Sequence, residues 1–170
     1  ARAYLDRIAS FNLPSLQKLG PVLARKLLPN AEDLCAEPPA LAQVENRTIP
    51  GTGSLIPLRI YTPPGDPPHP ILVYFHGGGW VLGHLDRIDR LCHTLSTEAR
   101  YLVVSVDYRL APEHPFPAAV EDADTATRWV AENATHLNGN PQRIAIGGDS
   151  AGGNLAVAVA LIARDRNFPS

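Results

Sequence analysis

A serine flanked by glycines, at Gly148, Ser150 and Gly152, is the pattern in this chain with the clearest chemical meaning. It follows the apolar stretch 143–146 and precedes an alanine-rich helical stretch, so it predicts a serine on a tight turn between a strand and a helix. Such a turn strains the serine backbone, and glycines tolerate the close packing because they lack a Cβ. The hydroxyl would point outward at a helix N-terminus, where the positive end of the helix favours the charge of a nucleophile. A glycine-rich turn capped by serine is the structural alternative.

A second glycine-rich segment, residues 76–80, has the sequence His-Gly-Gly-Gly-Trp and follows the apolar stretch 71–75. Three consecutive glycines leave backbone amides exposed. If this loop lies beside Ser150, its amides and that of Ala151 would converge on one point and stabilise a tetrahedral oxyanion. Taken alone, the segment is equally consistent with a flexible glycine loop. The two segments together indicate attack by a serine on a carbonyl group.

The elements that must position these segments alternate between strand and helix. From about residue 44 the chain shows extended runs typical of a hairpin, then three apolar runs typical of buried strands, each followed by a helical stretch. The expected hairpin strands are 44–49 and 58–61, the buried strands 71–75, 101–106 and 143–146, and the helices 87–100, 118–133 and 150–164. This order predicts a mostly parallel α/β sheet with helices on its faces and a ligand site beyond the carboxyl ends of the strands.

Residues 1–43 differ from this core, 44–170, because leucines recur there at helical spacing and prolines interrupt them. We expect short amphipathic helices that pack as a core-facing extension; a lid over a binding site and a membrane-surface helix are the alternatives.

Composition excludes several other classes of protein. The 170 residues carry a net charge of −2 without a basic block, which argues against nucleic acid as a partner. The apolar runs are too short for a membrane span, and no export signal is recognisable. Cys35 and Cys92 match no metal or redox spacing, so we predict reduced thiols in a cytoplasmic protein; a bridge between them is the alternative.

Three motifs now identify a resemblance: residues 76–80, residues 107–119 and residues 148–153. With their spacing, they resemble the motifs of the hormone-sensitive-lipase-like family of α/β-hydrolase esterases, over nearly the whole chain. The resemblance implies an α/β-hydrolase fold and a carboxylesterase that acts on short to medium acyl esters without a metal or other cofactor. It also implies that the N-terminal helices form part of a cap.

Carried over residue by residue, the resemblance makes Ser150 the nucleophile. The oxyanion-hole amides would come from Gly77, Gly78, Gly79 and Ala151, with Gly78 and Gly79 favoured among the loop glycines. The supporting residues would be His76, which helps hold the glycine loop and is not the catalytic base, Asp149 and Trp80.

The stretch 108–120 contains Arg109 and Glu113, which can pair, and three prolines that stiffen it. We expect it to act as a scaffold, and direct contact with the substrate is the alternative. Trp80 and Phe116 are candidates for lining an apolar acyl pocket, although aromatic residues at such places also occur as ordinary core.

A serine nucleophile needs a base and an acid, which follow it in the order Ser, Asp or Glu, His in this fold. All six histidines precede Ser150, and the one carboxylate after it is Asp165, so no residue matches the family's catalytic acid or base. We therefore expect the N-terminal portion of a longer hydrolase, inactive alone, with the C-terminal portion as its partner and homo-oligomer formation left open. A non-catalytic, receptor-like small-molecule-binding relative is the alternative.

Overall fold

A computed structural model describes residues 2–11, 14, 16–27, 40–41 and 43–166. The chain divides into two compact units, residues 1–37 and 38–170, and each is described by itself. The first contains helices α1 (Arg2–Ser10) and α2 (Leu16–Leu27), and α2 is kinked at Gly20, directly before Pro21. Leu5, Val22 and Leu23 of these helices are exposed. The cap role of this unit stays a prediction.

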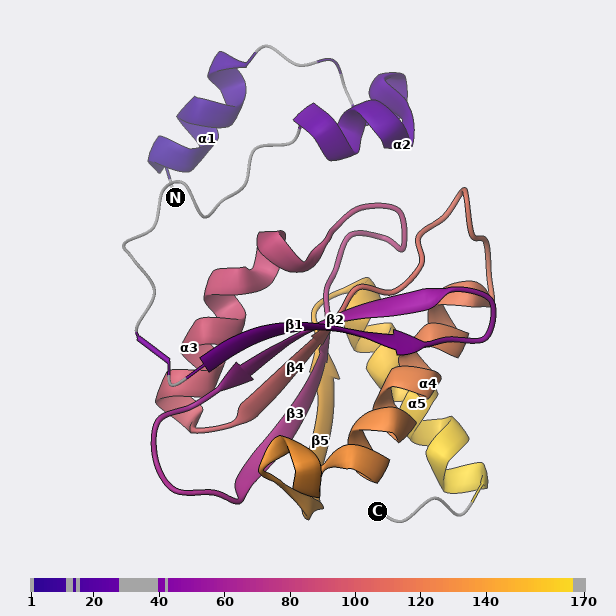
Figure 1. Cartoon of the computed structure of the whole chain (residues 1–170). Helices are drawn as coiled ribbons and strands as arrows, with labels where there is room; N and C mark the ends of the chain where they lie inside the picture. Colours follow the sequence, from indigo (N-terminus) through magenta and orange to yellow (C-terminus); the bar gives the residue numbers. More distant parts are fainter. Residues whose placement is uncertain (1, 12–13, 15, 28–39, 42, 167–170) are drawn as a thin grey trace. The chain divides into compact units, whose positions relative to one another are not determined.

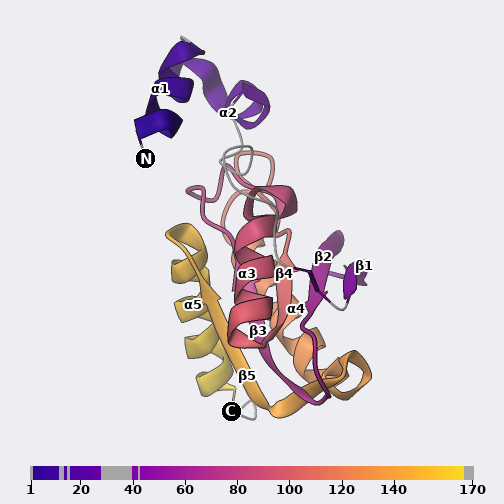
Figure 2. The ribbon, with the colours of Figure 1, turned by 90° about the vertical axis from the view of Figure 1, so that its left-hand side faces the viewer.

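In the second unit, the described residues form a sheet of five strands in the order β1-β2-β4-β3-β5 (Figure 1). The strands are β1 (Gln43–Pro50), β2 (Leu55–Thr62), β3 (His69–Phe75), β4 (Leu102–Val106) and β5 (Gly139–Gly148). β3 pairs in parallel with β4 and β5, whereas β2 pairs antiparallel with β1 and β4, so the sheet is mixed. Figure 2 shows β1 and β5 at opposite edges. The predicted hairpin and α/β fold class are confirmed.

Helices cover both faces of this sheet, as the alternation of its strand residues requires. Ile71, Val73 and Phe75 pack with α4 (Ala118–Asn133) and α5 (Ala151–Asp165) in the larger core. Tyr74 and Val103 point the other way, into a smaller core beside α3 (Asp89–Ala99). Short 3₁₀ helices, η2 (Leu85–Ile88) and η3 (Thr135–Leu137), precede α3 and β5.

Element boundaries agree with the sequence pattern to different degrees. Helix α4 has the predicted bounds, while β5 begins four residues earlier than expected because Gly139 pairs with His69 across a register shift. Cys92 is free and buried in the smaller core, where burial raises the pKa of its thiol to about 12. Cys35 lies outside the described residues. No helix among the described residues is long and apolar enough to cross a membrane.

Candidate active site

Ser150 occupies the turn between β5 and α5 in a backbone conformation that non-glycine residues rarely adopt, with φ 51° and ψ −117°. The residue is exposed, and its hydroxyl makes no capping hydrogen bond to α5. Its carbonyl oxygen accepts from Asn154 N at 3.1 Å. The structural alternative, a serine that caps the helix, is therefore wrong for this side chain.

Two glycines allow this turn to lie directly against the end of β3. A Cβ on Gly148 or on Gly152 would overlap the carbonyl oxygen of Phe75, a backbone atom that cannot move aside without shifting the strand. Ala151, between Ser150 and Gly152, is the first residue of α5, where helical N–H groups have no partner within the helix.

The glycine loop after β3 is tied to this turn through Asp149. Its Oδ1 accepts from Gly77 N at 2.9 Å and from the Tyr74 hydroxyl at 3.1 Å. A Cβ on Gly77 would overlap the same carboxylate, so the Asp149 side chain would have to move away from the loop. Burial, together with the charge of Asp149, raises the pKa of Tyr74, which keeps the phenol a hydrogen-bond donor.

His76 is fully buried beneath the loop, where it contacts Gly77 and Tyr108. Its Nδ1 donates to Gly77 O at 2.8 Å, and its ring stacks on Tyr108 at a centroid distance of 4.4 Å. The Tyr108 hydroxyl donates to His76 O at 2.6 Å. Burial lowers the pKa of His76, so the imidazole is neutral and supports the loop.

Three consecutive positive φ angles shape the middle of the loop. Gly78 has φ +130°, and a Cβ there would overlap Leu82 O, whereas Gly79 has φ +62° and open space around it. Trp80 has φ 59° although it is a bulky residue, and its carbonyl oxygen accepts from Ala111 N at 2.8 Å. The glycine loop is therefore tied to the segment between β4 and α4.

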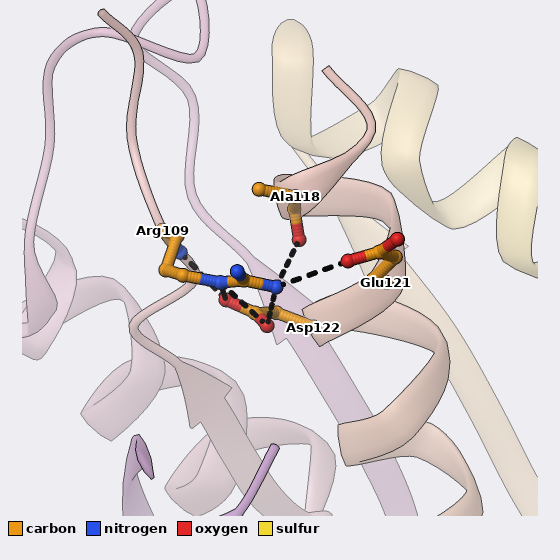
Figure 3. A network of polar contacts seen from close by, with 4 residues as sticks. All are labelled: Arg109, Ala118, Glu121 and Asp122. Atoms are coloured by element: carbon orange, nitrogen blue, oxygen red, sulfur yellow. Dashed lines mark hydrogen bonds and ion pairs between the residues drawn. The ribbon is translucent and has the colours of Figure 1, made fainter. Parts of the chain in front are cut away.

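Arg109 anchors that segment to α4 (Figure 3). Its guanidinium makes hydrogen bonds of 2.8–3.0 Å to the buried Asp122 carboxylate, which also accepts from Arg109 N, and reaches Glu121 at 3.2 Å. These hydrogen bonds raise the pKa of Arg109. The sequence pointed to Glu113 as its partner; the carboxylates that hold it come from α4 instead.

A cavity of about 340 Å³ lies between these segments. Its walls are mainly apolar and comprise Gly79, Trp80, Arg109, Ala111, His114, Phe116, Pro117, Ala119, Val120 and Asn154. Trp80 and Phe116 both line it and are both exposed. Among the described residues, no group of three or more His, Cys, Asp or Glu could hold a metal ion.

The structure thus brings Ser150, Ala151, Asp149 and the glycine loop to one end of the sheet. Sequence reasoning missed the residues that hold them there, Tyr74 and Asp122, because neither belongs to a motif and each contacts its partner across the fold.

Comparison with known proteins agrees with this geometry. A family model described as alpha/beta hydrolase fold matches residues 72–170, from β3 through the serine turn and α5. The chain belongs to the α/β-hydrolase family. Carboxylesterase NlhH of Mycobacterium tuberculosis is 50% identical over 129 residues, which are 75% of this chain and 40% of that protein. This α/β-hydrolase chain therefore spans less than half the length of that relative.

Solved α/β-hydrolase structures are also similar. An esterase from Pyrobaculum calidifontis has a TM-score of 0.74 and 52% identity, covering 75% of this chain and 42% of that one. An ester-hydrolase from the metagenome of Lake Arreo has a TM-score of 0.89 and 39% identity, covering 97% of this chain and 53% of that one. The predicted resemblance to hormone-sensitive-lipase-like esterases is confirmed.

Proposed function

We propose that this chain carries the nucleophile and oxyanion hole of a serine carboxylesterase for short to medium acyl esters. The observation that carries the proposal is the Ser150 turn: an exposed hydroxyl, unused in capping, at a helix N-terminus and next to a loop of glycine amides. The names of the similar proteins, carboxylesterase and esterase, support the same chemistry.

In the proposed reaction, Ser150 Oγ attacks the ester carbonyl and loses its proton to a base. The carbonyl π electrons move to oxygen, and the oxyanion is stabilised by the amides of Gly78, Gly79 and Ala151. When the tetrahedral intermediate collapses, the alcohol leaves with the proton from the base, and an acyl-enzyme remains. Water then attacks this ester in the same way and releases the acid. No metal or cofactor takes part in these steps.

Gly77 has a different role in this proposal from the other two loop glycines. Its amide already donates to Asp149, so it is not free to donate to an oxyanion. We assign Gly77 and Asp149 to holding the loop beside the nucleophile and assign His76 to supporting it from below.

The base and the acid are proposed to come from sequence outside these 170 residues, as part of the same hydrolase. This fits the share of 40% that the chain covers of its M. tuberculosis relative. Asp149, the carboxylate nearest in sequence to the nucleophile, is occupied by Gly77 N and Tyr74. Homo-oligomer formation and a cytoplasmic location stay predictions.

The apolar cavity is the proposed site for the hydrocarbon part of the ester. It borders Gly79 of the loop and Asn154, one helical turn from Ser150, so a group bound there stays close to the serine. Its volume is at the small end of ligand pockets, roughly 300–1,000 Å³, which favours short substrates. The non-catalytic, receptor-like alternative is not favoured, because these similar proteins are named as enzymes.

The test is Ser150→Ala in the protein as the organism expresses it. We expect kcat for p-nitrophenyl butyrate to fall at least about 1,000-fold while the protein stays folded. Ser54→Ala, in the turn between β1 and β2, is the matched control and should keep full activity. A fluorophosphonate probe should label wild type but not Ser150→Ala, as seen by intact mass. Undiminished turnover by Ser150→Ala would contradict the proposal, and ester binding without turnover by wild type would favour the receptor-like alternative.

A further inference from the structure

The segment that follows the glycine loop, up to Asp89, is held by Arg59, which takes no part in the chemistry proposed above. After Gly83, which packs so tightly on the His76 ring that a Cβ would overlap it, the chain enters η2 and then α3. Asp86 in η2 and Asp89, the first residue of α3, both accept from Arg59 Nη1 at 2.8 Å. Arg59 lies on β2, about 30 residues earlier in the chain.

This contact is more than a single surface ion pair. Arg59 is largely buried on the α3 face of the sheet, and its Nε donates to Asn46 Oδ1 of β1 at 2.8 Å. Burial alone would lower the pKa of Arg59, but the hydrogen bonds to Asp89 and Asp86 outweigh it and the pKa rises. The guanidinium therefore stays charged and bridges β1, η2 and α3.

Asp89 is fixed from other directions as well. The hydroxyl of the buried Tyr61 donates to its Oδ1 at 2.8 Å, and His93 Nε2 lies 3.4 Å from its Oδ2. The His93 ring meets Tyr61 edge-on at 5.3 Å. Asp89 is thus held in place at the N-terminus of α3. Arg59, which is bound to Asp89, in turn holds the more exposed Asp86.

We propose that Arg59 is a positioning residue for the oxyanion hole, which it sets by holding the end of the glycine loop through Asp86 and Asp89. The proposal rests on the proposed function. The start of the loop is tied by Asp149 and its middle by Ala111, so Arg59 supplies the third attachment. Loop amides must lie about 2.7–3.1 Å from the developing oxyanion, so a small displacement of the loop end weakens catalysis.

The exposure of Asp86 separates positioning from simple stabilisation. Its side chain is 66% exposed, and ion pairs at such exposed positions contribute little to the stability of the fold. A merely structural pair would therefore leave kcat unchanged when Asp86 is altered. A displacement of roughly 1 Å at reacting groups, by contrast, can cost up to about 100-fold in rate.

The experiment compares Asp86→Asn, Arg59→Gln and Arg59→Lys in the protein as the organism expresses it, with p-nitrophenyl butyrate as substrate. We expect Arg59→Gln to lower kcat about 10-fold and Asp86→Asn about 3-fold, with KM changed less than about 2-fold. Arg59→Lys should recover part of the loss because it keeps the positive charge. The recovery should be incomplete because lysine lacks the planar guanidinium with its several N–H donors. The affinity for an alkylboronic acid, which forms a tetrahedral adduct with a serine, should weaken in proportion to kcat/KM.

Asp165→Asn is the matched control, because Asp165 is also 66% exposed and pairs with Arg164 at 2.7 Å, far along α5 from the glycine loop. It should change neither kcat nor boronic acid affinity. If Arg59→Gln does not fold, Asp86→Asn decides the question alone.

Wild-type kcat and boronic acid affinity in the folded Asp86→Asn and Arg59→Gln proteins would overturn the positioning role. If Ser150→Ala is inactive in the same assay, that result leaves the proposed function standing. Activity in Ser150→Ala would instead remove the proposed function itself, whatever the Arg59 variants do.

Discussion

The serine turn and the glycine loop lie at the same end of the sheet and both contain a non-glycine residue at positive φ, yet they are held in different ways. Ser150 is fixed by backbone packing, since Gly148 and Gly152 bring the turn against Phe75 O. Trp80 lies in a loop fixed by hydrogen bonds that come from several elements. The turn is encoded in consecutive residues, whereas the loop depends on residues spread over the fold.

The largest effect should come from filling the backbone contact of the turn. Gly152→Ala places a Cβ onto the Phe75 carbonyl, so β3 or α5 must move, and we expect little folded protein. Thermal unfolding and soluble yield measure this. Gly147→Ala is the control, because its Cβ would meet only the flexible end of Leu72 at 3.4 Å. Equal melting temperatures for the two variants would contradict a turn held by close backbone packing.

The next largest effect, on stability, should come from the side chains that hold the segment between β4 and α4. Asp122 is 1% exposed and holds Arg109, whose segment binds Trp80 O through Ala111 N. Asp122→Asn should lower the free energy of unfolding by about 3 kcal/mol, because it leaves a largely buried guanidinium without its main partner.

Glu121→Gln provides the comparison for that variant, since it removes the other carboxylate on the same arginine. Glu121 is 44% exposed, so we expect a loss below about 1 kcal/mol. Denaturant unfolding of both proteins measures the difference. Equal losses would show that burial of Asp122 does not decide how the segment is held.

A smaller effect should follow from cutting the tie between turn and loop. Asp149→Ala leaves Gly77 N and the Tyr74 hydroxyl without their acceptor, at a cost of about 1–3 kcal/mol. Because the loop is released, kcat should also fall, by about 10-fold. Asp149→Asn keeps an acceptor oxygen and should retain more activity; steady-state kinetics on the folded variants checks this. If both variants keep wild-type kcat, the loop does not need this tie.

The contrast between the local serine turn and the glycine loop, which is held by distant residues, explains what the sequence could predict. The period of the apolar residues identified β3, β4 and α4, and the two glycine motifs located the turn and the loop, because these features are local. The partners of Arg109 and the Arg59 contacts were not predictable, since they join residues of different elements 12 to 30 positions apart in the chain. Nearness in sequence favours Glu113 as a partner of Arg109, whereas the fold places Asp122 of α4 against the guanidinium.

The smallest effect should come from His76, the fully buried side chain beneath the loop. Burial lowers its pKa below the ordinary 6.5, against the opposing influence of the Gly77 carbonyl and of Asp107 and Asp149. Between the pKa of the folded protein and 6.5, the unfolded chain binds a proton that the folded chain does not. The contribution of the neutral His76 to the stability of the folded protein is therefore complete above pH 6.5, and it is lost as the pH falls through that window.

The lowered pKa of His76 can be tested directly. The free energy of unfolding of wild type should decrease from pH 6.5 to about pH 5, and His76→Asn should show a shallower slope. Nitrogen NMR of the imidazole should show the neutral ring with the proton on Nδ1, because that atom donates to Gly77 O. An imidazole already charged at pH 6.5 would mean that the loop opens to water in solution, and the glycine loop would then be held less firmly than the turn.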